Sequence, residues 1–157
     1  MITHFSMEIQ GQLGKPVQER FVPIPYANDI YAASKKAGVS PFLVAAVVRV
    51  ESDFKWNALS YANCMGLMQI SQTVSLMYGN TNQSPLNIKH NLYAGSMYLS
   101  SLIHLYSGDT GKALVAYNEG LKWVNEGIYF PSSVKYSKKV LMYYFHYRWK
   151  YHDKFTR

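Results

Sequence analysis

Residues 42–50 form the most constraining stretch of this sequence, because every position except Arg49 is apolar. A helix that is apolar on all sides is a buried helix, so the run predicts a helix at the centre of a core. Glu51 follows it directly. A carboxyl group carried to the edge of a core is costly to ionise, which raises its pKa from about 4.3 toward about 6 and lets it donate a proton near neutral pH. The alternative is that Glu51 is a solvated glutamate at the end of a helix.

Composition limits the number of domains, the class of partner and the disulfides that this chain can have. The chain has 157 residues, of which 48% are hydrophobic, and this favours one folded domain with a substantial core. The net charge of +7 favours an anionic partner and does not choose among nucleic acid, an acidic polymer and a membrane face. Cys64 is the single cysteine, so no disulfide forms within the chain and the redox compartment stays open.

No apolar run approaches the roughly 18 to 20 residues that a transmembrane helix needs. The first ten residues, MITHFSMEIQ, lack the basic flank and apolar core of a secretory signal. We therefore expect no transmembrane segment, and either export by another route or prior removal of a signal.

The spacing of the apolar residues predicts an all-α chain. Residues 1–23 carry several glycines and prolines and are expected to form an irregular arm, followed by one domain over residues 24–157. Gly38 is expected to end the first helix in a left-handed cap, and Ser40 with Pro41 to begin the next. The pattern predicts helices over residues 26–37, 41–53, 67–78, 86–106, 110–118 and 132–151, with 86–106 the longest and with loops over 54–66 and 121–131.

The last segment is basic. From Ser133 onward it has seven lysines and arginines and one acid, Asp153. Basic residues interleaved with aromatic ones are compatible with binding nucleic acid. The simpler interpretation is a helix with an aromatic core face and a solvated basic face.

The sequence disfavours metal and cofactor chemistry. The five histidines lack zinc-ligand spacing, and neither a phosphate-binding glycine loop nor a GxSxG motif occurs. Cys64 is either a nucleophile paired with a distant histidine or a lone buried thiol. Acid–base chemistry by one of nine acids remains.

Four short patterns then point to a family. They are ESxFxxNAxS at residues 51–60 with GLMQI at 66–70, NLxxGxxYL at 91–99, ALxAYNxG at 113–120 and YxxxV at 136–140. In this order they resemble the lytic transglycosylase domain of the soluble (family 1) type.

This resemblance implies a lysozyme-like fold of the goose type, mainly helical, with a glycan-binding cleft. It implies peptidoglycan as substrate, no cofactor and no metal, and one catalytic residue, Glu51. As acid, Glu51 would protonate the oxygen of the β-1,4 bond between N-acetylmuramic acid and N-acetylglucosamine. As base, it would then remove the proton from the C6 hydroxyl, which closes onto C1 as a 1,6-anhydro ring.

The matching positions also imply substrate-binding residues. Tyr136 would contact either the substrate or Glu51. Each position has a simpler role in a loop, a helix end or the core as the alternative. The expected set is Ser60, Met68, Gln69, Tyr117, Asn118 and Tyr136.

Some positions depart from the family pattern. Asn63 and Cys64 replace the usual Gly-Ala, Ser71-Gln72 replaces Met-Pro, and Glu119 stands where a small residue is common. Glu119 would either position a water for competing hydrolysis or be an exposed residue at a helix end.

The expected partners are peptidoglycan glycan strands, in the periplasm or cell wall of the envelope, with an envelope or secretion-type complex as a further partner and no nucleic acid. Two other interpretations of the fold are a goose-lysozyme-like hydrolase and a non-catalytic glycan-binding subunit of an envelope assembly. A nucleic-acid binder that uses the basic segment is the remaining alternative.

Overall fold

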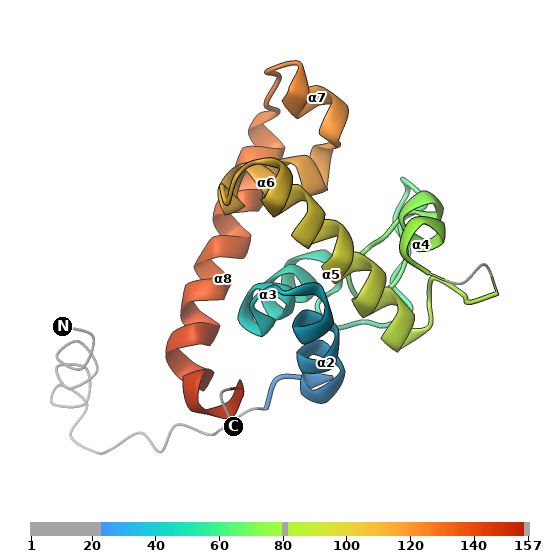
Figure 1. Ribbon diagram of the computed structural model, residues 1–157, viewed down its shortest axis with the longest axis vertical. Coiled ribbons are helices and arrows are strands. Elements are labelled where there is room, and N and C mark those ends of the chain that lie inside the picture. The colour runs from blue at the N-terminus through green and yellow to red at the C-terminus, as the bar shows by residue number, and fades with distance from the viewer. Residues whose placement is uncertain (1–22, 80–81, 156–157) are drawn as a thin grey trace, which may run out of the picture.

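The computed structural model describes residues 23–79 and 82–155, and these contain helices and no strand. The all-α prediction is confirmed for them (Figure 1). Predictions for residues 1–22 lie outside the described part. The helices are α2 (Ala27–Ala37), α3 (Pro41–Ser52), α4 (Gln72–Tyr78), α5 (Ile88–Leu105), α6 (Thr110–Glu119), α7 (Leu121–Asn125) and α8 (Pro131–Phe155).

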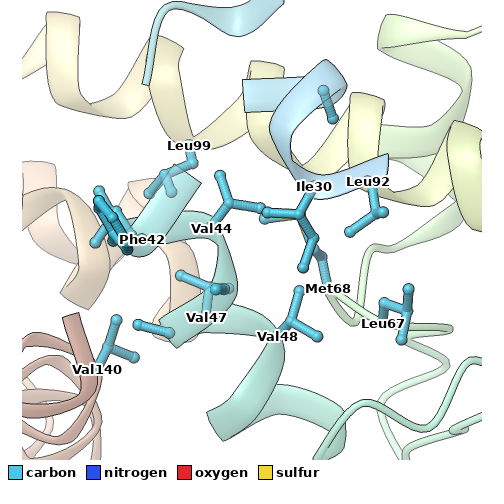
Figure 2. Close-up of a cluster of buried hydrophobic side chains, with 14 of the residues drawn as sticks. Ile30, Phe42, Val44, Val47, Val48, Leu67, Met68, Leu92, Leu99 and Val140 are labelled. Atoms are coloured by element: carbon cyan, nitrogen blue, oxygen red, sulfur yellow. The ribbon is translucent and has the colours of Figure 1, made fainter. Parts of the chain in front are cut away.

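Helix α3 is the centre of the core. All its residues from Phe42 to Val48 are buried, as the apolar run predicts. Figure 2 shows side chains of α3 in one buried cluster with Ile30 of α2, Leu99 of α5 and Val140 of α8. A helix packed on several sides in this way is fixed in rotation and along its axis, and it holds its last turn in place.

The chain turns sharply where α3 ends. Asp53 and Phe54 both have positive φ values, 51° and 60°, which a right-handed helix does not allow. Asp53 also pairs with Arg49 one turn earlier. Glu51 therefore lies in the last turn of a buried helix, directly before the chain leaves it.

The structure differs from the predicted helices in three respects. Residues 67–78 are not one helix. Gly66 and Gln69 have positive φ values, isolated bridges join Met65 to Leu59 and to Ile70, and α4 begins only after Ser71, whose hydroxyl accepts a hydrogen bond from the Val74 N–H. The predicted loop at 121–131 contains α7, and the longest helix is α8 with 25 residues, not α5 with 18.

The predicted caps are present with one difference. Gly38 ends α2 in the left-handed conformation, with φ 71°. Ser40 precedes Pro41 at the start of α3, but its side chain accepts no capping hydrogen bond. The hydroxyl of Ser40 is thus available for other contacts.

The basic last segment has the simpler of its two predicted arrangements. On α8, Tyr143 and Tyr147 are half-buried against the core, while Lys138 and Arg148 are exposed. Across residues 23–79 and 82–155, no helix has both the length and the apolarity required to cross a bilayer.

Candidate active site

Glu51 and Tyr136 form the central pair of the candidate site. The Tyr136 hydroxyl of α8 donates a hydrogen bond of 2.7 Å to Oε1 of Glu51. Burial raises the pKa of Glu51 to about 7, although the hydrogen bond from Tyr136 lowers it. Desolvation is the larger effect, so this carboxyl keeps a proton at a pH where an exposed glutamate is ionised.

A second tyrosine comes from α6. The Tyr117 hydroxyl donates to the Met68 carbonyl at 2.7 Å, and its ring lies 5.5 Å from that of Tyr98. Burial, and then the negative charge of Glu51, raise the pKa of both Tyr117 and Tyr136 well above the ordinary value. Both phenols therefore remain hydrogen-bond donors near Glu51 over the whole physiological pH range.

The loop that follows α3 is fixed by its own polar groups. Gln69 donates from Nε2 to the carbonyls of Ala58 at 3.0 Å and Gly66 at 2.9 Å. Ser60 accepts from the Cys64 N–H at 3.2 Å. Ser52, next to Glu51, donates to the Leu67 carbonyl at 2.8 Å. The bonds of Gln69 and Ser60 hold the loop together internally, and the bond from Ser52 attaches it to the last turn of α3.

Asn91 attaches the same loop to α5. Its Nδ2 donates to the carbonyls of Met65 at 2.8 Å and Pro85 at 2.7 Å, and its Oδ1 accepts from the Met68 N–H at 2.8 Å. The side chain is only 1% exposed. In the sequence, Asn91 was considered only as part of a family pattern, and its role in attaching the loop to α5 was missed. The sequence feature that could have indicated this role is an amide side chain one residue before Leu92, on the buried side of an amphipathic helix.

The structure therefore brings together most of the expected residues. Glu51, Tyr136 and Tyr117 converge, and Ser60 and Gln69 lie in one loop whose bonds reach the end of α3. Asn118 is exposed in the last turn of α6, and its side chain has no hydrogen bond to the described residues.

Met68 is placed differently from the expectation. Its side chain is fully buried, and a Cβ added at Gly95 would lie 2.6 Å from its sulfur. The absence of a side chain at Gly95 thus provides the space that Met68 fills. A direct contact between the Met68 side chain and a ligand, as expected from the sequence, does not fit this packing.

Glu119 is not the exposed helix-end residue expected as one alternative. It is half-buried at the end of α6, and its Oε2 accepts a 2.8 Å hydrogen bond from the Phe130 N–H. Because Phe130 directly precedes α8, this contact joins the end of α6 to the start of the helix that carries Tyr136.

Cys64 is a free, half-buried thiol. Burial raises the pKa of Cys64, a side-chain hydrogen bond with Ser60 offsets part of the rise, and the negative charge of Glu51 adds to it. The net rise disfavours the thiolate, so the thiol is a poor nucleophile here.

This chain is similar to a known protein family and to several characterised proteins. The family model described as "Transglycosylase SLT domain" matches residues 29–138. The membrane-bound lytic murein transglycosylase C of Photorhabdus laumondii is 33% identical over 111 residues, which is 60% of this chain and 31% of that protein. The chain spans less than a third of the length of the curated relatives it matches.

Two solved structures have a similar fold. The first is the lytic transglycosylase Slt from Pseudomonas aeruginosa, solved as an inactive glutamate-to-glutamine mutant. Its TM-score is 0.74 at 25% identity, over 92% of this chain and 27% of that one. The second is the 70-kDa soluble lytic transglycosylase of Escherichia coli, with a TM-score of 0.73 at 24% identity, over 90% of this chain and 26% of that one. The second likeness concerns the fold alone.

Proposed function

This chain belongs to the Transglycosylase SLT domain family, and from that premise we propose that it cleaves peptidoglycan glycan strands as a lytic transglycosylase. The observation that carries the proposal is the state of Glu51. Its carboxyl is half-buried, has a pKa of about 7 and is held by the Tyr136 hydroxyl. A group that holds and releases a proton near neutral pH is suited to act first as acid and then as base.

In the first step, Glu51 donates its proton to the glycosidic oxygen between N-acetylmuramic acid and N-acetylglucosamine. Tyr136 donates to Oε1, so we assign the transferred proton to Oε2. The bond from C1 to the glycosidic oxygen breaks, and the N-acetylglucosamine side leaves with a free 4-hydroxyl. Positive charge develops at C1 and its ring oxygen, as in other glycoside cleavages.

In the second step, the Glu51 carboxylate removes the proton from the muramoyl C6 hydroxyl, and that oxygen bonds to C1. The product is a 1,6-anhydro sugar, no water is consumed, and Glu51 regains its proton. The hydrogen bond from Tyr136 stabilises the carboxylate between the two steps, because a bond to an ionised acceptor is stronger than one to a neutral acceptor. The nucleophile belongs to the substrate, so a second carboxylate is not required.

Three side chains have hydrogen-bonding capacity left for the sugars. The Ser60 hydroxyl accepts a bond from the Cys64 N–H and hydrogen-bonds to the Cys64 side chain, so a second lone pair on its oxygen remains to accept from a sugar hydroxyl. Oε1 of Gln69 has no partner among the described residues, because only Nε2 bonds to the loop. Asn118 is exposed. We assign substrate binding to these three, and we assign to Met68 a positioning role through its carbonyl, which holds Tyr117.

Two further points support the proposal. The related Slt structure is described as an inactive mutant with glutamine in place of a glutamate, and we take Glu51 as the counterpart of that glutamate. The chain carries a net charge of +7, which favours encounter with an anionic cell wall. Since peptidoglycan lies in the cell envelope, we place the activity there.

Product analysis tests the proposal. The purified protein is incubated with peptidoglycan sacculi, and the released muropeptides are weighed by mass spectrometry. We expect 1,6-anhydromuramoyl products. Products one water heavier, with reducing ends, would indicate a goose-lysozyme-like hydrolase instead. An absence of released fragments, with binding to sacculi retained, would indicate a non-catalytic glycan-binding subunit.

Tyr136→Phe should move the pH dependence of the activity. Removing the hydroxyl removes the contact that lowers the pKa of Glu51, so the carboxyl stays protonated to higher pH. We expect the alkaline limb of the pH–rate profile to move up by about one unit, and the maximal rate to fall about 10- to 100-fold because the carboxyl is less well oriented. The measurement is the rate of sacculus clearing from about pH 5 to pH 9.

Tyr93→Phe is a matched control, because Tyr93 contacts Lys36 on the surface and has no bond to Glu51. Its profile should overlay that of the parent. An unchanged alkaline limb in Tyr136→Phe would show that Glu51 is not the group whose titration limits the rate.

A further inference from the structure

A second concave site lies at the other end of α3. It is a groove of about 790 Å³ between the turn that joins α2 to α3, the end of α5, the start of α6 and one side of α8. Ser40 lines it, and Glu51 lies eleven residues further along. At a rise of 1.5 Å per residue these positions are about 16 Å apart along the helix axis, so the groove is separate from the candidate active site.

Unused polar groups converge on this groove. Its lining includes Ser40, Ser100, Ser107, Thr110 and His104. None of these five side chains hydrogen-bonds to another side chain or main-chain group within the described part of the chain. Ser40 is the clearest case, since it occupies an N-cap position and yet makes no capping bond. A row of hydroxyl groups without protein partners suits a ligand that itself carries many hydroxyl and amide groups.

The other lining residues are apolar or aromatic. Leu43, Ile103 and Leu141 contribute aliphatic surface. Tyr144 and Phe145 stand side by side on α8 with their ring centroids 5.2 Å apart, and Phe145 is 59% exposed. An open aromatic face next to hydroxyl groups is suited to the apolar face and polar edge of a sugar ring.

Charge narrows the class of ligand. Among the residues that the structure describes, no lysine, arginine, aspartate or glutamate lines the groove, although the chain as a whole has a net charge of +7. A pocket beside α4 and α5 is different, because Lys36 and Lys89 line it. A groove without cations is poorly suited to nucleic acid or other phosphate polymers, whose binding depends on lysine and arginine.

From the uncharged lining, the unused hydroxyl groups and the aromatic wall together, we infer that this groove binds a second stretch of N-acetylated glycan, away from the bond that is cut. The inference rests on the proposed function for the identity of the polymer. A second contact would keep the enzyme attached to the wall while Glu51 releases one product and meets the next bond. It would therefore act on the apparent affinity for polymeric substrate and leave the turnover rate unchanged.

The test uses the full chain with Glu51→Gln, which is expected to bind sugar without cutting it. The probe is the tetramer of N-acetylglucosamine, titrated into isotopically labelled protein and followed by amide chemical shifts. We expect two groups of shifts, one near Gln69 and one at groove positions including Ser100, His104 and Thr110. Phe145→Ala should weaken binding in the second group about tenfold and leave the first unchanged.

Met142→Ala is the matched control, since Met142 is 58% exposed on the same helix and does not line the groove. It should leave both groups of shifts unchanged. His104→Ala changes an exposed lining residue and should also weaken the second group, which guards against misfolding of Phe145→Ala. The absence of groove shifts, or equal effects of Phe145→Ala and Met142→Ala, would overturn the inference.

Activity separates this inference from the proposed function. In the active protein, Phe145→Ala should raise KM for sacculi several-fold with kcat unchanged. Normal lysis without groove shifts would overturn the inference alone. Groove shifts in a protein that releases no fragments would overturn the proposed catalysis and leave a glycan-binding groove.

Discussion

Glu51→Gln is expected to abolish lysis of peptidoglycan and also to make the folded protein more stable at alkaline pH. The activity should fall at least about a thousand-fold, because the glutamine amide can neither donate the proton to the leaving oxygen nor remove one from the C6 hydroxyl. The shape of the side chain is retained, and the amide can still accept the bond from Tyr136. Loss of activity would then reflect lost proton transfer and not lost packing.

The stability gain follows from the raised pKa. Glu51 has a pKa of about 7 when folded, against a reference value of 4.5, so the folded state binds this proton more tightly than the unfolded state does. As the pH rises from about 4.5 to about 7, the parent protein therefore loses free energy of unfolding, and the loss reaches about 3 kcal/mol above pH 7. Glutamine does not ionise. Its advantage should be absent near pH 4 and complete near pH 8.

Urea unfolding of both proteins at these two pH values measures the difference, with sacculus clearing as the activity assay. Glu126→Gln is the control, since Glu126 is an exposed glutamate that follows α7. It should change neither quantity. Retained clearing in Glu51→Gln would remove Glu51 from the mechanism, and an equal stability difference at both pH values would show that its carboxyl is not desolvated.

The burial of the central helix α3 was predictable from its amino-acid composition alone. An unbroken apolar run has no face that water can wet, so α3 had to be inside. The turn at residues 66–70 was not predictable in the same way. Leu67 and Ile70 are buried by packing against the core, and the left-handed conformations of Gly66 and Gln69 break the helix that their apolar spacing favours.

The candidate site was likewise predictable only in part. Position after the apolar run identified Glu51 as a candidate acid. The family resemblance named Glu51 as one of two alternative contacts for Tyr136, and the hydrogen bond between them agrees with that alternative. Helical spacing alone does not pair them, because the two residues are 85 positions apart and the packing of α8 on α3 brings them together. Met68 shows the limit of transferring a motif. Its place in the GLMQ pattern predicted a substrate contact, whereas its buried side chain fills the space over Gly95. A sequence pattern does not distinguish such packing from a ligand contact.

Asn91→Ala should be the most destabilising single change near the site. The substitution leaves the Pro85 carbonyl and the Met68 N–H without their partner, while the Met65 carbonyl keeps its bond from the Ile70 N–H. Each buried group left unpaired costs about 1–3 kcal/mol, so the total for two groups is about 2–6 kcal/mol. This is a large part of the 5–15 kcal/mol that typically holds a domain folded. Urea unfolding near neutral pH measures the loss.

The same change should reduce lysis even where the protein remains folded. Asn91 holds the Met68 N–H, and the Met68 carbonyl in turn accepts from Tyr117, so a released loop also releases a tyrosine beside Glu51. Ser101→Ala is the control on the same helix, because its exposed hydroxyl bonds only to the Tyr98 carbonyl within α5. Its effect should be within about 0.5 kcal/mol. Equal stabilities of the two variants would mean that apolar packing alone holds the loop, and that the amide of Asn91 has no part in shaping the site.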